Sequence, residues 1–201
     1  MALKRILCFC MVLFVCSMTA FAAQTYTVQK GDSLWKIAVR YEVGLSELIA
    51  ANPQFHNPNL IYPGDTVVIP VKDAQIDAME KRVFELVNQE RAANGLKALE
   101  YDWQIARVAG YKACDMRDTG YFNHTSPVYG SPFEMLRNFG ISFTAAGENI
   151  AKGQRTAETV MQGWMNSPGH RANILNANYT TSGVGYCAGQ GGPYWVQMFV
   201  R

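Results

Sequence analysis

A five-residue connector at positions 71–75 divides this sequence into two units, and their sizes limit what each unit can fold into. The connector, which reads VKDAQ, follows Pro70 and lacks the Gly, Ser or Pro bias of a long flexible linker. The first unit, residues 24–70, is so short that few folds of that size are stable without a disulfide or a metal. The second unit, residues 76–201, is long enough for a hydrophobic core of its own. We therefore expect two domains that lie close together.

Residues 1–22 have the features of a secretory signal peptide. Lys4 and Arg5 precede an apolar run at residues 6–18, and the sequence AFA at 20–22 matches a small-x-small cleavage site. The apolar run is too short to span a membrane comfortably, because a span needs about 20 apolar residues. We therefore expect a secreted protein whose mature form has no transmembrane anchor.

Removal of this segment changes both the charge and the cysteine count. The full sequence has 18 basic and 16 acidic residues, so the loss of Lys4 and Arg5 leaves 16 of each. A neutral chain does not favour nucleic-acid binding. Three of the five cysteines lie within the first 22 residues, which leaves Cys114 and Cys187. These two form either one disulfide or two buried free thiols, and the small number of cysteines favours the thiols.

The first unit has the pattern of a strand, two helices and a closing strand. Residues 26–29 read as the first strand, and Asp32 or Ser33 can cap the helix that follows. The apolar residues of this helix recur at i, i+3, i+4 and i+7, namely at Leu34, Ile37, Ala38 and Tyr41. Residues 46–51 predict a second short helix, and residues 66–69 a strand after the Pro63-Gly64 turn.

This unit closely resembles a LysM domain. The resemblance rests on residues 26–38 (YTVQKGDSLWKIA), residues 59–65 (NLIYPGD) and residues 67–70 (VVIP). It implies binding of N-acetylglucosamine-containing glycans, either peptidoglycan or chitin, in a shallow groove between two loops. Such a neutral sugar needs backbone hydrogen bonds and apolar contact rather than a charged pocket. Carried over to this sequence, the groove residues are Gly31, Asp32, Ser33, Leu34, Asn59, Leu60, Ile61 and Tyr62.

The second unit places most of its helices before its strands. Helices are predicted over residues 76–93, from Asp102 to Gly120, from Ser131, from Thr156 and from Ser167. Strands are predicted over residues 143–152, 183–188 and 194–200. This order indicates an α+β protein in which helices pack on a small antiparallel sheet.

Four polar residues of the second unit are candidates for a site, but their spacing alone does not predict one. They are His124, Glu134, Glu148 and His170. The gaps between them are far longer than those of a zinc motif such as H-x3-H. Each also has a structural explanation: Glu134, for example, can complete a capping box with Ser131.

From residue 76 onward the sequence resembles the bacterial CAP superfamily, which also contains the pathogenesis-related 1 proteins. The matching stretches are residues 84–91, 122–127, 131–134, 147–151, 164–171 and 183–186. The resemblance implies an α-β-α sandwich with a cavity that holds two histidines and two glutamates. Residue by residue, these map to His124, Glu134, Glu148 and His170. Such a set suits a divalent metal, zinc above all, or metal-free acid–base chemistry.

Together, the two resemblances predict a secreted protein of the cell wall or spore envelope. LysM would bind peptidoglycan or a chitin-like glycan, and the CAP domain would meet a wall-associated partner, with a role in the spore envelope or germination. One alternative is a LysM-targeted peptidoglycan hydrolase that uses the His/Glu tetrad. Another is a lipid-binding CAP protein. The absence of G-x-S-x-G and H-E-x-x-H motifs favours a binding protein over an enzyme.

Overall fold

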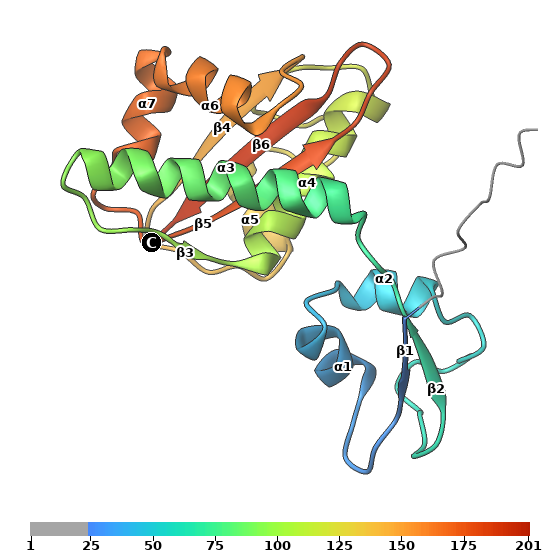
Figure 1. Cartoon of the computed structure of the whole chain (residues 1–201). Helices are drawn as coiled ribbons and strands as arrows, with labels where there is room; N and C mark the ends of the chain where they lie inside the picture. The colour runs from blue at the N-terminus through green and yellow to red at the C-terminus, as the bar shows by residue number, and fades with distance from the viewer. Residues whose placement is uncertain (1–23) are drawn as a thin grey trace, which may run out of the picture.

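The computed structural model describes residues 24–201 and contains two domains joined by a short connector (Figure 1). The predicted signal peptide at residues 1–22, with its three cysteines, lies outside the described residues. Within residues 24–201, no helix combines the length and the apolar character that a membrane span requires.

The N-terminal domain has the predicted strand–helix–helix–strand order. Strands β1 (Gln24–Thr27) and β2 (Thr66–Ile69) pair antiparallel, with Tyr26 opposite Val67. Helices α1 (Leu34–Arg40) and α2 (Leu45–Ala50) pack on them. Ser33 caps α1, because its Oγ accepts a hydrogen bond from the backbone NH of Lys36. The buried apolar core is formed by Val28, Leu34, Ile37, Ala38, Leu48, Val67 and Ile69.

One buried amide ties α2 to β2. Asn52 is 1% exposed, and its Nδ2 donates to the carbonyls of Leu48 and Val68 at 2.7 Å each. Its Oδ1 accepts from the backbone NH of Val68, also at 2.7 Å. A single side chain therefore satisfies backbone groups that two short elements would otherwise leave buried without partners.

The C-terminal domain contains five helices and four strands within the described residues. The helices are α3 (Ala74–Ala93), α4 (Trp103–Asp118), α5 (Pro132–Asn138), α6 (Ala157–Met165) and α7 (Pro168–Ile174). The strands are β3 (Glu100–Tyr101), β4 (Ala146–Lys152), β5 (Thr181–Cys187) and β6 (Tyr194–Val200). Asp102 and Thr156 cap α4 and α6, and Ser131 opens α5 with a capping box.

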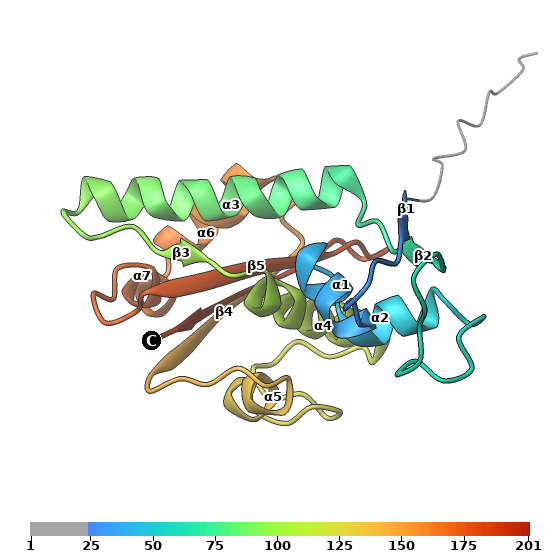
Figure 2. The same ribbon diagram turned by 90° about the horizontal axis from the view of Figure 1, so that it is seen from below.

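The four strands form one sheet that is covered on both faces, so the domain is an α-β-α sandwich as predicted. The strand order is β3-β5-β6-β4; β3 runs parallel to β5, and the other pairs are antiparallel. Helices α3 and α6 lie on one side of the sheet, and α4 and α5 on the other (Figure 2). All seven residues of β6 are buried, as expected for a central strand that touches both helical layers.

Two glycines bring α4 unusually close to the sheet. A Cβ added to Gly183 would lie 2.1 Å from the backbone N of Ala106, and one added to Gly185 would lie 2.0 Å from the backbone N of Gly110. Only glycine fits at these two positions of β5. The short distance between α4 and β5 in turn places side chains of α4 beside the end of β5.

The expectation of two free thiols is wrong. Cys114 on α4 and Cys187 at the end of β5 form a disulfide, with their Cα atoms 5.1 Å apart. Because 73 positions separate the two cysteines, nothing in the local sequence reveals the pairing. The close approach of α4 to β5 supplies the short Cα–Cα distance that a disulfide needs.

Some boundaries differ from the sequence prediction. Helix α3 begins at Ala74 instead of residue 76, because the carboxylate of Asp73 accepts hydrogen bonds from the next backbone NH groups at 2.8 and 3.1 Å. The connector is correspondingly shorter than residues 71–75. Strand β4 begins at Ala146 rather than 143. Strand β3 was not predicted, because two residues are too few to display an alternating pattern.

Candidate functional site

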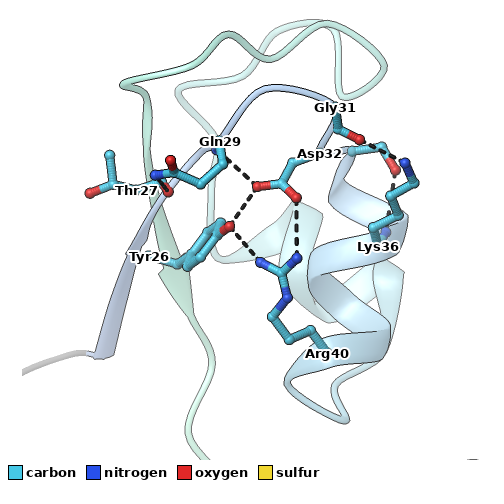
Figure 3. Close-up of polar contacts among 8 residues, drawn as sticks. Tyr26, Thr27, Gln29, Gly31, Asp32, Lys36 and Arg40 are labelled. Carbon is cyan, nitrogen blue, oxygen red and sulfur yellow. Dashed lines mark hydrogen bonds and ion pairs between the residues drawn. The ribbon is translucent and has the colours of Figure 1, made fainter.

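In the first LysM-like loop, the carboxylate of Asp32 is held by contacts within the domain (Figure 3). It accepts hydrogen bonds from Tyr26 Oη at 2.6 Å and from the backbone NH of Gln29 at 2.9 Å, and pairs with Arg40 at 3.3 Å. These contacts, above all the Tyr26 hydroxyl, lower the pKa of Asp32. Asp32 therefore fixes the shape of the loop, and its charge is already neutralised by Arg40.

The other predicted residues of this loop fall into two groups. Gly31 has a φ of +89°, which favours glycine, and its carbonyl accepts from Lys36 Nζ at 2.7 Å. Gly31 and Ser33 are exposed. Leu34 is only 2% exposed and belongs to the domain core. Its side chain is therefore not part of a surface groove, and only its backbone can contribute there.

The second loop presents apolar side chains. Leu60 is 53% exposed and Tyr62 is 58% exposed, whereas Ile61 packs partly against the core. The backbone NH of Tyr62 donates to the carboxylate of Asp65 at 2.7 Å, which shapes the turn. Backbone hydrogen bonds of 2.9 and 3.0 Å join Val28 to Asp65 and Gly64, so the ends of the two loops lie side by side.

In the C-terminal domain, the structure brings His124 and Glu148 into direct contact. His124 Nδ1 lies 2.7 Å from Glu148 Oε1. The His124 side chain is 53% exposed, whereas that of Glu148 is 1% exposed. Burial raises the pKa of Glu148, and the hydrogen bond to His124 and the charge of Lys112 oppose that rise. The second oxygen, Oε2, is buried with no hydrogen-bond partner among residues 24–201.

Neighbouring helices position this pair. Glu148 lies on β4, and Asn173 of α7 donates to its backbone carbonyl at 3.1 Å. Asn149, also on β4, donates to the carbonyl of His170 at 3.2 Å. This contact brings His170 into the same region as the pair, and burial and the nearby charge of His124 lower the pKa of His170. On the opposite side, Lys112 Nζ donates to the carbonyl of His124 at 2.5 Å.

Glu134 does not join the other three. It is exposed, and its Oε2 accepts hydrogen bonds from the backbone NH and the Oγ of Ser131 at 2.8 and 2.7 Å. These contacts complete the capping box of α5 and lower the pKa of Glu134. As arranged, the four side chains do not converge: the Glu134 carboxylate is engaged in the capping box, and His124 Nδ1 and Glu148 Oε1 contact each other. Residues 24–201 contain no group of three or more His, Cys, Asp or Glu side chains that could hold a metal ion.

Sequence reasoning missed the residues that support the pair. Lys112 is fully buried, and it lies seven positions after Ile105 and four before Met116, both on the apolar face of α4. A lysine at a core position of an amphipathic helix was the available signal. Asn149 and Asn173 gave none, because their partners are backbone groups far away in the sequence.

What this pair can do chemically follows from its surroundings. A buried carboxylate beside an imidazole orients the ring and fixes which of its nitrogens faces the carboxylate. Because half of the His124 side chain is exposed, a molecule from solvent can reach it. The arrangement therefore suits proton transfer or hydrogen bonding to a bound ligand.

Comparison with known proteins gives two family matches. The model of the cysteine-rich secretory protein family (CAP) matches residues 84–199, and the LysM domain model matches residues 26–70. The Bacillus subtilis protein YkwD is 53% identical over 127 residues, which are 63% of this chain and 49% of YkwD. The Bacillus cereus spore coat assembly protein ExsA is 45% identical over 51 residues, which are 25% of this chain and 8% of ExsA.

A solved structure is also similar. An extracellular protein from Bacillus anthracis that contains an SCP domain superposes with a TM-score of 0.59 and 34% identity. The match covers 69% of this chain and 47% of that protein. This chain thus spans about half the length of YkwD and of the Bacillus anthracis protein.

Proposed function

This chain belongs to the cysteine-rich secretory protein family and carries a LysM domain, and we propose that it is a secreted cell-wall protein that binds peptidoglycan. In this proposal LysM holds N-acetylglucosamine-containing glycan, and the CAP domain meets a wall-associated partner or ligand. Two features of the LysM loops carry the proposal. The second loop exposes the side chains of Leu60 and Tyr62, and in the first loop the carboxylate of Asp32 is neutralised by a residue of the same domain. Such a surface favours a neutral, partly apolar ligand over a charged one.

The composition and the relatives support the place of action. With residues 1–22 removed, the chain has equal numbers of acidic and basic residues, so bulk attraction to charged wall polymers is weak. ExsA, which matches 51 residues of this chain, is named for spore coat assembly. We therefore include the spore envelope among the walls to which this protein binds.

Binding to insoluble peptidoglycan tests the LysM part of the proposal. Residues 24–201 should sediment with purified sacculi, and Tyr62→Ala should weaken retention roughly tenfold, or about 1.4 kcal/mol, because the exposed ring loses its contact with the sugar. Phe133→Ala is the matched control, since Phe133 is an exposed aromatic of the other domain. Equal retention of Tyr62→Ala and the parent protein would show that this loop does not bind the glycan.

A second candidate function is peptidoglycan hydrolysis by the CAP domain. It is favoured by the half-exposed His124 beside the buried Glu148, whose Oε2 has no partner among the described residues. His124 would exchange a proton with the substrate, and Glu148 would orient the ring. Zinc at the tetrad stays a prediction, and no step here depends on it.

Release of soluble muropeptides from sacculi separates the two functions. A hydrolase should release them, and His124→Ala and Glu148→Ala should each abolish the release. Glu134→Gln should leave the release unchanged, because the Glu134 carboxylate accepts hydrogen bonds from Ser131 instead of contacting His124 or Glu148. If the parent protein binds sacculi but releases nothing, the CAP domain acts by binding alone.

A further inference from the structure

A cavity of about 410 Å³ lies between the two domains, away from both sites described above. Its walls come from the N-terminal domain, the connector, α3, α4 and the sheet. Its aromatic walls are Tyr101, Trp103, Tyr111 and Tyr186. Cavities of this size between domains, with aromatic walls and a few convergent polar groups, are typical of small-ligand sites.

The most buried polar group of this cavity is the carboxylate of Glu80 on α3. Its side chain is 2% exposed, and its Oε1 accepts a hydrogen bond from the backbone NH of Tyr186 at 2.9 Å. Its Oε2 pairs with the Nζ of Lys72, which is a connector residue. Burial raises the pKa of Glu80 to about 7, against the opposing charge of Lys72. A carboxylate held this deeply depends strongly on a cation for its charge.

The other charged groups of the cavity are also mostly acidic. Glu47 pairs with Arg107 at 2.9 Å, and Tyr111 Oη also donates to Glu47. Asp77 pairs with Lys81 at 2.8 Å within α3. Including Glu42, four carboxylates line the cavity, and three of them are each paired with a cation, namely Lys72, Lys81 or Arg107, so one carboxylate is in excess. The cavity thus carries an excess of negative charge that complements a cationic ligand.

We propose that this cavity binds a primary ammonium group carried on an apolar stem, and that Lys72 occupies the position of that group as an internal ligand. The structure holds such a group there already: the ammonium of Lys72 lies on Glu80, at the end of a four-carbon chain. Lys72 is exchangeable because its side chain is 44% exposed and lies on the connector rather than on a helix or strand. The aromatic side chains that line the cavity favour both an alkyl stem and a cation.

The chemical class is therefore an alkylamine, either a free diamine or the side chain of a lysine-like residue in a peptide. Calorimetric titration of residues 24–201 with 1,5-diaminopentane and with Nα-acetyl-lysine N-methylamide distinguishes the two sources. Binding of the diamine alone assigns the site to free amines, and binding of both admits a peptide side chain. 1-Pentanol is the uncharged control and should not bind.

The decisive variants act in opposite directions. Lys72→Ala removes the internal competitor. Whichever of the two amines binds should therefore bind Lys72→Ala at least about tenfold more tightly than the parent protein, which corresponds to about 1.4 kcal/mol. Lys72→Gln should show the same direction, and it keeps a polar partner for Glu80 in case the alanine variant is poorly folded. Glu80→Gln should lose binding. Arg82→Ala is the matched control on α3, because Arg82 pairs with Glu85 and Glu158, outside the cavity, and it should not change the affinity.

Three results would overturn the proposal. One is that neither amine binds the parent protein, Lys72→Ala or Lys72→Gln. The second is that the two Lys72 variants bind no more tightly than the parent protein, which would make Lys72 a purely structural tie. The third is undiminished binding by Glu80→Gln, which would place the amine elsewhere.

Discussion

The two candidate sites differ in what happens to their carboxylates. In the LysM domain, Asp32 has three donors from its own domain, and the adjacent loop exposes the uncharged side chains of Leu60 and Tyr62. In the CAP domain, Glu148 is buried, and one of its two oxygens has no partner within residues 24–201. A satisfied carboxylate shapes a loop, whereas an incompletely satisfied one beside an imidazole is ready to interact with a ligand. The first site therefore suits binding, and the second suits chemistry or tight polar recognition.

The two domains also differ in the interactions that stabilise each of them. Loss of the CAP disulfide should produce the largest change in stability. Cys114→Ala combined with Cys187→Ala opens a loop of 73 positions in the CAP domain, which costs roughly 4 kcal/mol of its unfolding free energy. The LysM domain has no part in this bond. Calorimetry should show a lower CAP transition with glycan binding by LysM intact. A fall in both transitions would mean that the domains unfold as one unit.

The reverse experiment uses the buried amide of the LysM domain. Asn52→Ala should destabilise that domain by about 1–3 kcal/mol, because buried backbone groups of Leu48 and Val68 lose their partners. The CAP transition should stay in place. Asn59→Ala, at an exposed asparagine of the same domain, is the stability control. If the two variants melt alike, the hydrogen bonds of Asn52 contribute little.

The smallest expected effect is electrostatic and concerns Glu148. Lys112→Met keeps the volume of the buried side chain and removes the charge that lowers the pKa of Glu148, so that pKa should rise further above its ordinary value. A carboxyl-carbon NMR titration measures it. Lys152→Met, at the exposed end of β4, should leave the pKa unchanged. An unchanged pKa in Lys112→Met would mean that Lys112 only supports the backbone of His124.

Local sequence patterns predicted much of the fold. The caps at Asp102, Ser131 and Thr156 each satisfy orphan NH groups within three residues, so their sequence signals are self-contained. Strand β6 also lies where the sequence predicted a strand, over residues 194–200. The two family resemblances added the α-β-α arrangement and the LysM order, both of which the structure and the family matches confirm.

Contacts between residues that are far apart in the sequence could not be predicted from local patterns. The Cys114–Cys187 disulfide joins residues whose neighbourhood is set by the packing of α4 on β5. The contact of Arg107 with Glu47 crosses the domain boundary over 60 positions. For the tetrad, the capping-box explanation of Glu134 proved as informative as the family motif, because that role occupies its carboxylate. Local sequence signals predicted local hydrogen bonds, and distant pairs required the fold.

The short connector limits how far the second domain can work from the first. Strand β2 ends at Ile69 and α3 begins at Ala74, so the four residues between them extend at most about 14 Å. Once LysM is attached to a polymer, the CAP domain samples only a thin shell around that attachment point. At such short tether lengths the effective concentration of a neighbouring target is on the order of millimolar. A CAP domain with weak intrinsic affinity would therefore still be occupied at the wall and empty elsewhere.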